Sequence, residues 1–288
     1  MVAFTVNTNN YKDKVAALLD ECQKGVMRFR DTKEYMSYLS TILKFRKYSP
    51  RNALLIYLQN PRATFVAGYT DWQRKFKRYV KKNEKGIKIF APNIKKCKSQ
   101  EGSDEEEIIS GFHVVTVFDI SQTEGQELPT LQYPIDMDNE IVNDYDILME
   151  ALTAFSEFIV IYSDNLGNIM GLCDYKNERI LLNIKYSKKH LIATLVHEIS
   201  HLKLHNPSDR ENIVPQNIRE MEAESVSYIV CAYFNILYGE FTFRYISSYC
   251  TELQLQDFLK SNEKIKNLSI EIIDFLETYK KTKYADKN

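Results

Sequence analysis

Residues 197–201 read His-Glu-Ile-Ser-His, an HExxH pattern whose residue types and spacing could hold a metal ion and activate water. In a helix, His197 and His201 lie one turn apart on the same face, so both imidazoles can reach one zinc ion. Glu198 follows the first histidine and can accept a proton from a zinc-bound water. The pattern therefore predicts a metal-dependent hydrolase with Zn²⁺ as cofactor and Glu198 as the catalytic base.

The residues around the motif predict the helix that must carry it. Residues 189–205 are apolar at helical spacing, which indicates a long and mostly buried helix. Buried polar groups are costly unless they are paired or bind metal, which favours a metal site over two unrelated surface histidines. His205 continues the one-turn series beyond the reach of the same ion, so we expect a surface or helix-end residue.

A catalytic zinc site takes three protein ligands and a water, so a third ligand is needed. A histidine ten positions after the first would be residue 207, which is Pro207. Residues 217–238 form a strongly apolar helical run that begins with three acids, Glu220, Glu222 and Glu224. Glu220 and Glu224 share a helix face, and Glu222 points away from it. We predict Glu220 as the metal ligand and Glu224 as the partner of a ligand's free ring nitrogen, with Glu224 and Glu222 as alternative ligands.

Three further segments flank this pair of helices. Residues 168–183 predict a hairpin with its turn at Lys176-Asn177 and a second strand over Arg179–Asn183. A strand just before the metal helix could hold an extended peptide by backbone pairing, or be an ordinary sheet edge, and both readings stay open. Residues 245–258 and 265–279 predict closing helices.

The region 165–235 resembles a zincin metallopeptidase of the glutamate-ligand type, with the order strand, HExxH helix, glutamate helix. Glu220-x-x-Ala223-Glu224 resembles the third-ligand motif of ImmA/IrrE-like and ArdC-like peptidase domains. The resemblance implies cleavage of a protein substrate that the sequence does not identify. The same ligands would also accept Mn²⁺ or Fe²⁺, less tightly than Zn²⁺.

Composition sets the broad class of the chain. Its 288 residues are enough for two domains, and 44% hydrophobic residues are typical of a globular protein. No apolar stretch reaches the length of about 18 residues that a membrane span needs, and the start lacks a signal-sequence pattern. Five scattered cysteines without a CxxC indicate free thiols in a reducing cytosol. We therefore expect a cytoplasmic protein without a membrane partner.

The net charge of −1 conceals a strong asymmetry. Residues 1–100 carry 22 Lys and Arg against 7 Asp and Glu, whereas residues 101–288 carry 16 against 32. Such a split predicts two modules with different partners.

The basic half begins with helical patterns over residues 11–29, 31–47 and 53–59, the last opened by Ser49-Pro50. Residues 72–98 then hold eleven Lys or Arg and one acid. Lys85-Gly86 reads as a hairpin turn that leads into a strand over Ile87–Ala91.

Positive charge beside aromatic rings suits single-stranded nucleic acid, because cations neutralise phosphates and rings stack on unpaired bases. The rings here are Trp72, Phe76, Tyr79 and Phe90. A solvated basic surface over core aromatics is an equally good reading of the composition, and we expect Trp72 to be a core residue. The predicted nucleic-acid contacts are Lys75, Arg78, Lys82 and Lys85.

A long N-terminal stretch favours the nucleic-acid reading. YSPRNALLIYLQNPRATFVAGYTDWQRKFKRYVKKNEKGIKIFAP (48–92), followed by VFDISQTEG (117–125), resembles the N-terminal domain of ArdC-type antirestriction proteins. The resemblance implies a domain that binds single-stranded DNA and precedes a zincin-like metallopeptidase domain. It also implies a mobile-element protein that protects incoming single-stranded DNA from restriction.

The sequence thus predicts an α+β protein of two domains. Residues 1–130 would be an ArdC-like N-terminal domain that binds single-stranded DNA, and residues 140–288 a zincin-like metallopeptidase domain. The linker would lie near 128–139, and the acidic stretch 99–107 would be an exposed loop. Two alternatives remain: a DNA-protecting protein with a structural, non-proteolytic zincin domain, and a regulatory peptidase that cleaves a repressor.

Overall fold

The structure is a computed structural model that contains both α-helices and β-strands. The chain forms two compact units. Unit 1 comprises residues 1–28 and 47–130, and unit 2 comprises residues 29–46 and 131–288. The sequence-based division assigns residues 29–46 to the first domain, whereas the structure places them in unit 2. The described residues are 8–27, 29, 32–98, 105–128, 144–206, 214–236, 243, 249 and 254–285.

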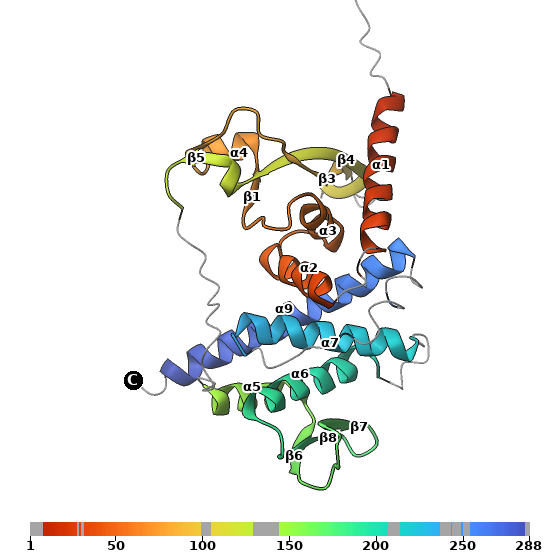
Figure 1. Ribbon diagram of the computed structural model, residues 1–288, viewed down its shortest axis with the longest axis vertical. Helices are drawn as coiled ribbons and strands as arrows, with labels where there is room; N and C mark the ends of the chain where they lie inside the picture. Colours follow the sequence, from red (N-terminus) through yellow and green to blue (C-terminus); the bar gives the residue numbers. More distant parts are fainter. Residues whose placement is uncertain are drawn as a thin grey trace, which may run out of the picture. The chain divides into compact units, whose positions relative to one another are not determined.

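Unit 1 is built on an antiparallel sheet in which β4 lies between β1 and β3 (Figure 1). A second, two-stranded antiparallel sheet joins β2 to β5. The helices are α1, α3 and α4, with a short 3₁₀ helix η1 before β5. In chain order the elements are α1 (Thr8–Val26), α3 (Pro50–Gln59), β1 (Val66–Gly68), α4 (Tyr69–Arg74), β2 (Arg78–Val80), β3 (Ile87–Lys98), β4 (Glu105–Asp119), η1 (Ile120–Gln122) and β5 (Thr123–Gly125).

Helix α3 begins as the sequence predicts and closes the free edge of the sheet. The hydroxyl of Ser49 accepts a hydrogen bond from the Asn52 N–H, and Pro50 occupies the first turn. The Asn52 amide then holds both backbone groups of Phe90 on β3, at 2.8 and 2.9 Å. Gln59 does the same for the N–H and C=O of Lys88, at 2.8 and 2.9 Å. Two amide side chains therefore occupy the outer edge of β3.

Three sequence-based predictions for unit 1 meet different outcomes. Trp72 is fully buried and donates its ring N–H to the Phe118 carbonyl at 2.9 Å, which confirms it as a core residue. Lys85-Gly86 leads into β3 but is not a hairpin turn, because β2 pairs with β5 and β3 pairs with β4. Residues 105–107 are not a loop, because they pair with residues 96–98 within the β3–β4 ladder; residues 99–104 lie outside the described residues.

Unit 2 packs helices together and carries a small three-stranded sheet next to α6 (Figure 1). The sheet order is β6-β8-β7, with β6 parallel and β7 antiparallel to β8. Helix α7 packs against α6, α9 and α2. The elements are α2 (Thr32–Lys44), α5 (Tyr145–Ser156), β6 (Ile159–Ser163), β7 (Gly171–Asp174), β8 (Arg179–Asn183), α6 (Lys188–Leu204), α7 (Gln216–Tyr233) and α9 (Leu255–Ala285).

The two helices that matter for the site arise from clear local signals. Ser187 caps α6, its hydroxyl accepting from the His190 N–H, and the buried face includes Leu195, Val196 and Ile199. Helix α7 buries Val226, among others, on its own apolar face. Each buried side chain of this kind stabilises the packing by about 1.5–3 kcal/mol, so the two helices hold a fixed relation. The predicted helices over 189–205 and 217–238 are thereby confirmed, the second ending earlier, at Tyr233.

The predicted hairpin before α6 is also confirmed. Strands β7 and β8 pair antiparallel from Asp174↔Arg179 to Gly171↔Leu182. The Asp174 carboxylate organises the turn, accepting from the Asn177 amide at 2.8 Å and from Arg179 Nε at 2.9 Å. The hairpin thus brings β7 to the edge of the sheet that lies against α6.

Within the described part of the chain, no helix combines the length and apolar character needed to cross a membrane. Cys22, Cys173 and Cys231 are free thiols, in line with the prediction for those three. Most of the predicted linker at 128–139 and most of the predicted helix 245–258 lie outside the described residues. The last predicted helix, 265–279, forms part of the longer α9.

Candidate metal centre

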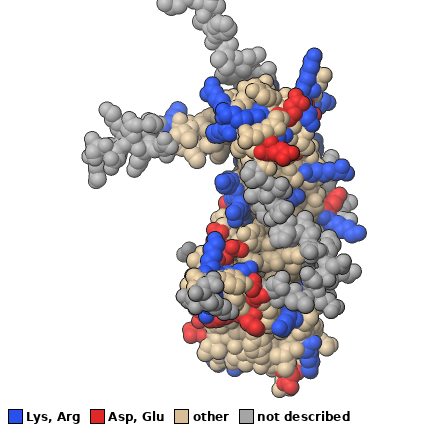
Figure 2. All heavy atoms as spheres, turned by 90° about the vertical axis from the view of Figure 1, so that its left-hand side faces the viewer, with Lys and Arg blue, Asp and Glu red and all other residues tan. Residues whose placement is uncertain are grey.

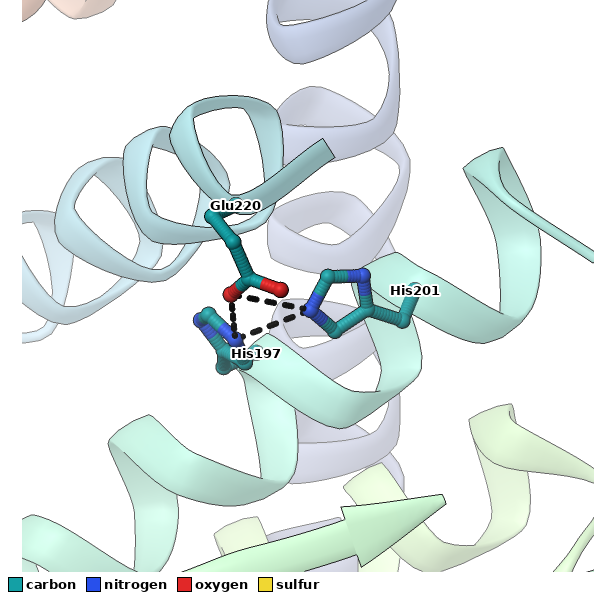
Figure 3. A group of neighbouring side chains, drawn as sticks. All are labelled: His197, His201 and Glu220. Carbon is teal, nitrogen blue, oxygen red and sulfur yellow. Dashed lines mark hydrogen bonds and ion pairs between the residues drawn. The ribbon is translucent and has the colours of Figure 1, made fainter. Parts of the chain in front are cut away.

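His197, His201 and Glu220 bring one ligand atom each to a common point between α6 and α7 (Figure 3). The two Nε2 atoms are 3.0 Å apart, and Glu220 Oε2 lies 3.5 Å from that of His197 and 3.6 Å from that of His201. Ligand atoms around a tetrahedral zinc with bonds of about 2.0–2.1 Å are about 3.3–3.4 Å apart. The triangle therefore fits a small divalent cation.

Carboxylates surround the histidines and make the electrostatic potential at the site negative. Burial by itself lowers the pKa of His197, but hydrogen bonds to Glu220 and Glu224 outweigh burial and raise that pKa to about 10. The hydrogen bonds from His197 and His201 hold the pKa of Glu220 well below its usual range. A site that favours positive charge this strongly is suited to a cation.

Glu224 lies on the far side of the first histidine from the metal triangle. Its Oε2 is 3.5 Å from His197 Nδ1, one helical turn beyond Glu220 on the same face of α7. A carboxylate at this place can hold the outer ring nitrogen, which fixes the tautomer whose Nε2 lone pair points into the triangle of ligand atoms. The geometry is the one that the i, i+4 spacing of the two acids predicts.

Glu198 is positioned by the strand that lies against α6. The backbone N–H of Cys173 on β7 donates a hydrogen bond to the Glu198 carboxylate. Burial raises the pKa of Glu198, and the nearby His197 and His201 oppose that rise. A carboxylate whose pKa lies above its usual range is a better proton acceptor. The arrangement can therefore serve general-base chemistry beside the metal.

His205 lies at the C-terminal end of α6, which agrees with the helix-end reading, but it is not a surface residue. Its side chain is only 1% exposed, and Nε2 lies 2.7 Å from Oε2 of Glu222, which is 2% exposed. Its Nδ1 faces Nδ1 of His201 at 3.1 Å. Burial lowers the pKa of His205, although its hydrogen bond to Glu222 opposes that. Glu222, an alternative metal ligand by sequence, points away from the triangle and pairs with His205.

Sequence reasoning missed three residues beside the site: Gly171, Tyr175 and Arg219. A side-chain carbon added at Gly171 would meet Thr194 Cγ2 at 2.4 Å and Glu198 Cγ at 3.3 Å, so only glycine lets β7 lie this close to α6. Burial raises the pKa of Tyr175, as do Cys173 and Glu198 nearby, whereas Arg219 lowers it. Nε of Arg219 is buried and has no hydrogen-bond partner among the described residues. A glycine inside a predicted strand was the only usable signal.

The predicted nucleic-acid contacts in unit 1 differ in what their side chains do. Lys82 and Lys85 are exposed, and Lys75 is 68% exposed while pairing with Asp71 at 3.0 Å. The guanidinium of Arg78 is instead used within the unit, donating to Thr123 Oγ1 at 2.8 Å and to the Thr123 carbonyl at 3.0 Å. Figure 2 shows Lys and Arg on the unit 1 part of one face, with Asp and Glu among them.

Known proteins resemble this chain in the sequence of its N-terminal part and in its fold. Residues 8–118 match the family model for the N-terminal domain of anti-restriction factor ArdC. In fold the chain is similar to the antirestriction ArdC protein from the R388 plasmid, in its metal-free and Mn(II)-bound crystal structures. Both matches have a TM-score of 0.55 and cover 86% of this chain, with 97% and 98% of the respective solved chains. The identities, 18% and 17%, make this a likeness of fold.

A relative in sequence extends along nearly the whole chain. It is the uncharacterized protein pXO2-81 of Bacillus anthracis, 25% identical over 315 aligned residues. The alignment covers 94% of this chain and 52% of that protein, so the chain spans about half the length of this relative. The chain is thus ArdC-like in the sequence of its N-terminal part and in its fold.

Proposed function

We propose that unit 2 is a zinc-dependent metallopeptidase domain of the glutamate-ligand zincin type. His197, His201 and Glu220 would hold the metal, and Glu198 would act as the base. The observation that carries this proposal is the convergence of three ligand atoms within 4.8 Å of one another, with Glu198 next to them. Zn²⁺ is our choice of metal, and Mn²⁺ is the alternative, because the R388 ArdC protein has a Mn(II)-bound crystal structure.

A bound metal would polarise the peptide carbonyl and lower the pKa of a water molecule at its open position. Glu198 would accept a proton as the water oxygen attacks the carbonyl carbon, and would pass that proton to the amide nitrogen as the C–N bond breaks. The Cys173 N–H holds the Glu198 carboxylate in place for both transfers. Glu224 keeps His197 oriented.

The edge strand β7 gives this site a way to hold an extended peptide. It is an outer strand of its sheet, and it contacts the metal helix α6. A substrate paired with an edge strand is held by its backbone, so many sequences would be accepted. This supports a protein substrate, whose identity the site does not specify.

The test of the peptidase proposal is a pair of variants in the full chain. Glu198→Gln should retain the metal content of the wild type, measured by atomic emission, and lose hydrolysis of denatured casein. Glu220→Ala should lose both. Full cleavage by Glu198→Gln would show that Glu198 is not the base. A wild-type protein that binds no divalent metal would contradict the proposed metal site.

We propose that unit 1 binds single-stranded DNA and that the protein acts in antirestriction. The support is the match of residues 8–118 to a domain of an anti-restriction factor, together with the exposed Lys75, Lys82 and Lys85. The triple change of these lysines to alanine should weaken binding to a single-stranded oligonucleotide and flatten its salt dependence by about 0.7 per lost phosphate contact. Equal affinity of the wild type for duplex and single-stranded oligonucleotides would count against the preference.

The second candidate is a protein that protects DNA without cleaving anything. It is favoured by the fold shared with the R388 protein, which is named for antirestriction and not for cleavage. Restriction protection of incoming DNA, measured with Glu198→Gln, separates the two: retained protection favours the binder, and lost protection favours the enzyme. A regulatory peptidase that cleaves a repressor is a third candidate, and casein cleavage without any effect on restriction would favour it.

A further inference from the structure

Beside the proposed metal centre lies a series of hydrogen-bonded polar side chains that the proposed mechanism does not use. It runs from His201 through His205 and Glu222 to Ser261 on α9 and on to Tyr249. Four contacts define it: His201 Nδ1 to His205 Nδ1 at 3.1 Å, His205 Nε2 to Glu222 Oε2 at 2.7 Å, Ser261 Oγ to Glu222 Oε1 at 2.6 Å, and Tyr249 to Ser261 at 2.7 Å. His205, Glu222, Ser261 and Tyr249 are all buried.

Only one placement of protons satisfies all of these groups once His201 presents its Nε2 lone pair to the metal triangle. His201 then carries its proton on Nδ1 and donates it to His205 Nδ1. His205 must therefore carry its proton on Nε2, where it donates to the Glu222 carboxylate. Ser261 donates to the other carboxylate oxygen, so its own oxygen accepts from the Tyr249 hydroxyl.

We infer that His205 and Glu222 are positioning residues for the metal site, linking the buried carboxylate to the ligand His201 through a second imidazole. This inference rests on the proposed metal centre. Glu222 serves His201 through His205, as Glu224 serves His197 directly. The carboxylate fixes the tautomer and ring orientation of the ligand and raises its basicity, which strengthens the bond to a cation.

The position of Glu222 supports this role over a purely structural one. Ionic groups in the protein interior are costly, and apolar residues of similar size often stabilise a fold as well or better. The His205–Glu222 pair nevertheless sits directly behind a ligand, and its hydrogen bonds continue from that ligand across α6, α7 and α9. The last helix of the chain is thereby connected to the metal site.

The experiment measures the dissociation constant of Zn²⁺ alone by competition with a chromophoric chelator, using the metal-free full chain. Glu222→Gln keeps the shape of the side chain and removes its charge, and we expect binding about 10–100-fold weaker. Ser269→Ala is the matched control, because Ser269 is a buried serine of α9 that donates to the Ile265 carbonyl and lies outside this series of polar groups. Its Zn²⁺ affinity should equal that of the wild type.

A double variant, His205→Leu with Glu222→Leu, separates positioning from folding. It replaces both members of the buried pair by apolar groups and leaves no unpaired charge, so the thermal unfolding midpoint of the metal-free protein should fall only by the loss of the acceptor of Ser261. Its Zn²⁺ affinity should nevertheless fall at least tenfold. The inference is overturned if Glu222→Gln and the double variant both bind Zn²⁺ as tightly as the wild type, or if Ser269→Ala loses as much affinity as they do. Either result leaves the proposed metal site uncontradicted. No Zn²⁺ binding by the wild type overturns both.

Discussion

Gly171 of β7 lies directly against Glu198 of α6, so close that a side-chain carbon at residue 171 would be 3.3 Å from Cγ of the glutamate. The strand that donates the Cys173 N–H to Glu198 can approach only because this position has no side chain. The position of Glu198, the proposed base, thus depends on Gly171, a residue without a side chain.

Gly171→Ala should therefore damage both stability and hydrolysis. The added methyl would lie 2.4 Å from Thr194 Cγ2, and overpacking of this kind costs about 1–3 kcal/mol. Gly68→Ala is the control, because a carbon added there meets nothing within 4 Å. Thermal unfolding and casein hydrolysis measure the two effects. Equal behaviour of the two variants would show that the close approach does not position Glu198.

Glu220 and Glu224 should differ in how much metal affinity each provides. Glu220→Gln replaces the anionic ligand by a neutral amide, a poor ligand for zinc, and should abolish stoichiometric Zn²⁺ binding. Glu224→Gln leaves the triangle intact and should weaken binding by about 10–100-fold, the usual effect of losing a partner of a ligand histidine. Chelator competition on both variants tests the order. The reverse order would make Glu224 the ligand, one of the alternatives that the sequence leaves open.

Asn52→Leu should destabilise unit 1 by about 2–4 kcal/mol, because the buried N–H and C=O of Phe90 would both lose their partner. Gln59→Leu, whose hydrogen bonds to Lys88 are solvent-exposed, should cost much less. The chain contains one tryptophan, Trp72 in unit 1, so its fluorescence during urea unfolding reports on this unit. Similar losses in the two variants would contradict the difference in burial.

The turn at Asp174 should make a small, pH-dependent contribution to stability. Hydrogen bonds from Asn177 and then Arg179 lower the pKa of Asp174 below its usual 3.8. A lowered folded-state pKa means that the contribution is present above the unfolded pKa and is lost as the pH falls through the folded one. Asp174→Asn should therefore unfold at a lower temperature than the wild type at neutral pH, and the difference should vanish once the pH has fallen below the folded-state pKa. A constant difference would exclude the carboxylate as its cause.

Helical spacing predicted the two pairs from which the triangle is drawn, because i, i+4 pairs must share a face whatever surrounds them, but it left the choice among Glu220, Glu224 and Glu222 open. It placed His197 with His201 and Glu220 with Glu224. Helical spacing could not reveal that His205 is buried, because its carboxylate partner Glu222 lies on α7. The hydrogen bonds continue from Glu222 to Ser261 on α9, far along the chain. Because histidine is polar, we expected the His205 side chain to be exposed to solvent, but its hydrogen bond to Glu222 on α7 allows it to be buried.

Unit membership and strand pairing were harder to predict for the same reason. The helix over 32–44 carries an ordinary amphipathic pattern, yet Tyr35 packs with Phe243 and Tyr249, far along the chain. Local sequence likewise shows Gly86 before a strand, but not that β2 pairs with β5. Patterns within one element predict its type and its faces, whereas its neighbours depend on contacts that periodicity does not encode.

The amide side chains along β3 have a consequence for how this protein behaves at high concentration. An open strand edge is a template on which another chain can add, and such addition is a route to swapped dimers and fibrils. Asn52 and Gln59 already occupy the outward backbone groups of Phe90 and Lys88. A second copy therefore finds no free pairing positions at these two residues, which protects the outer edge of β3 from self-association there.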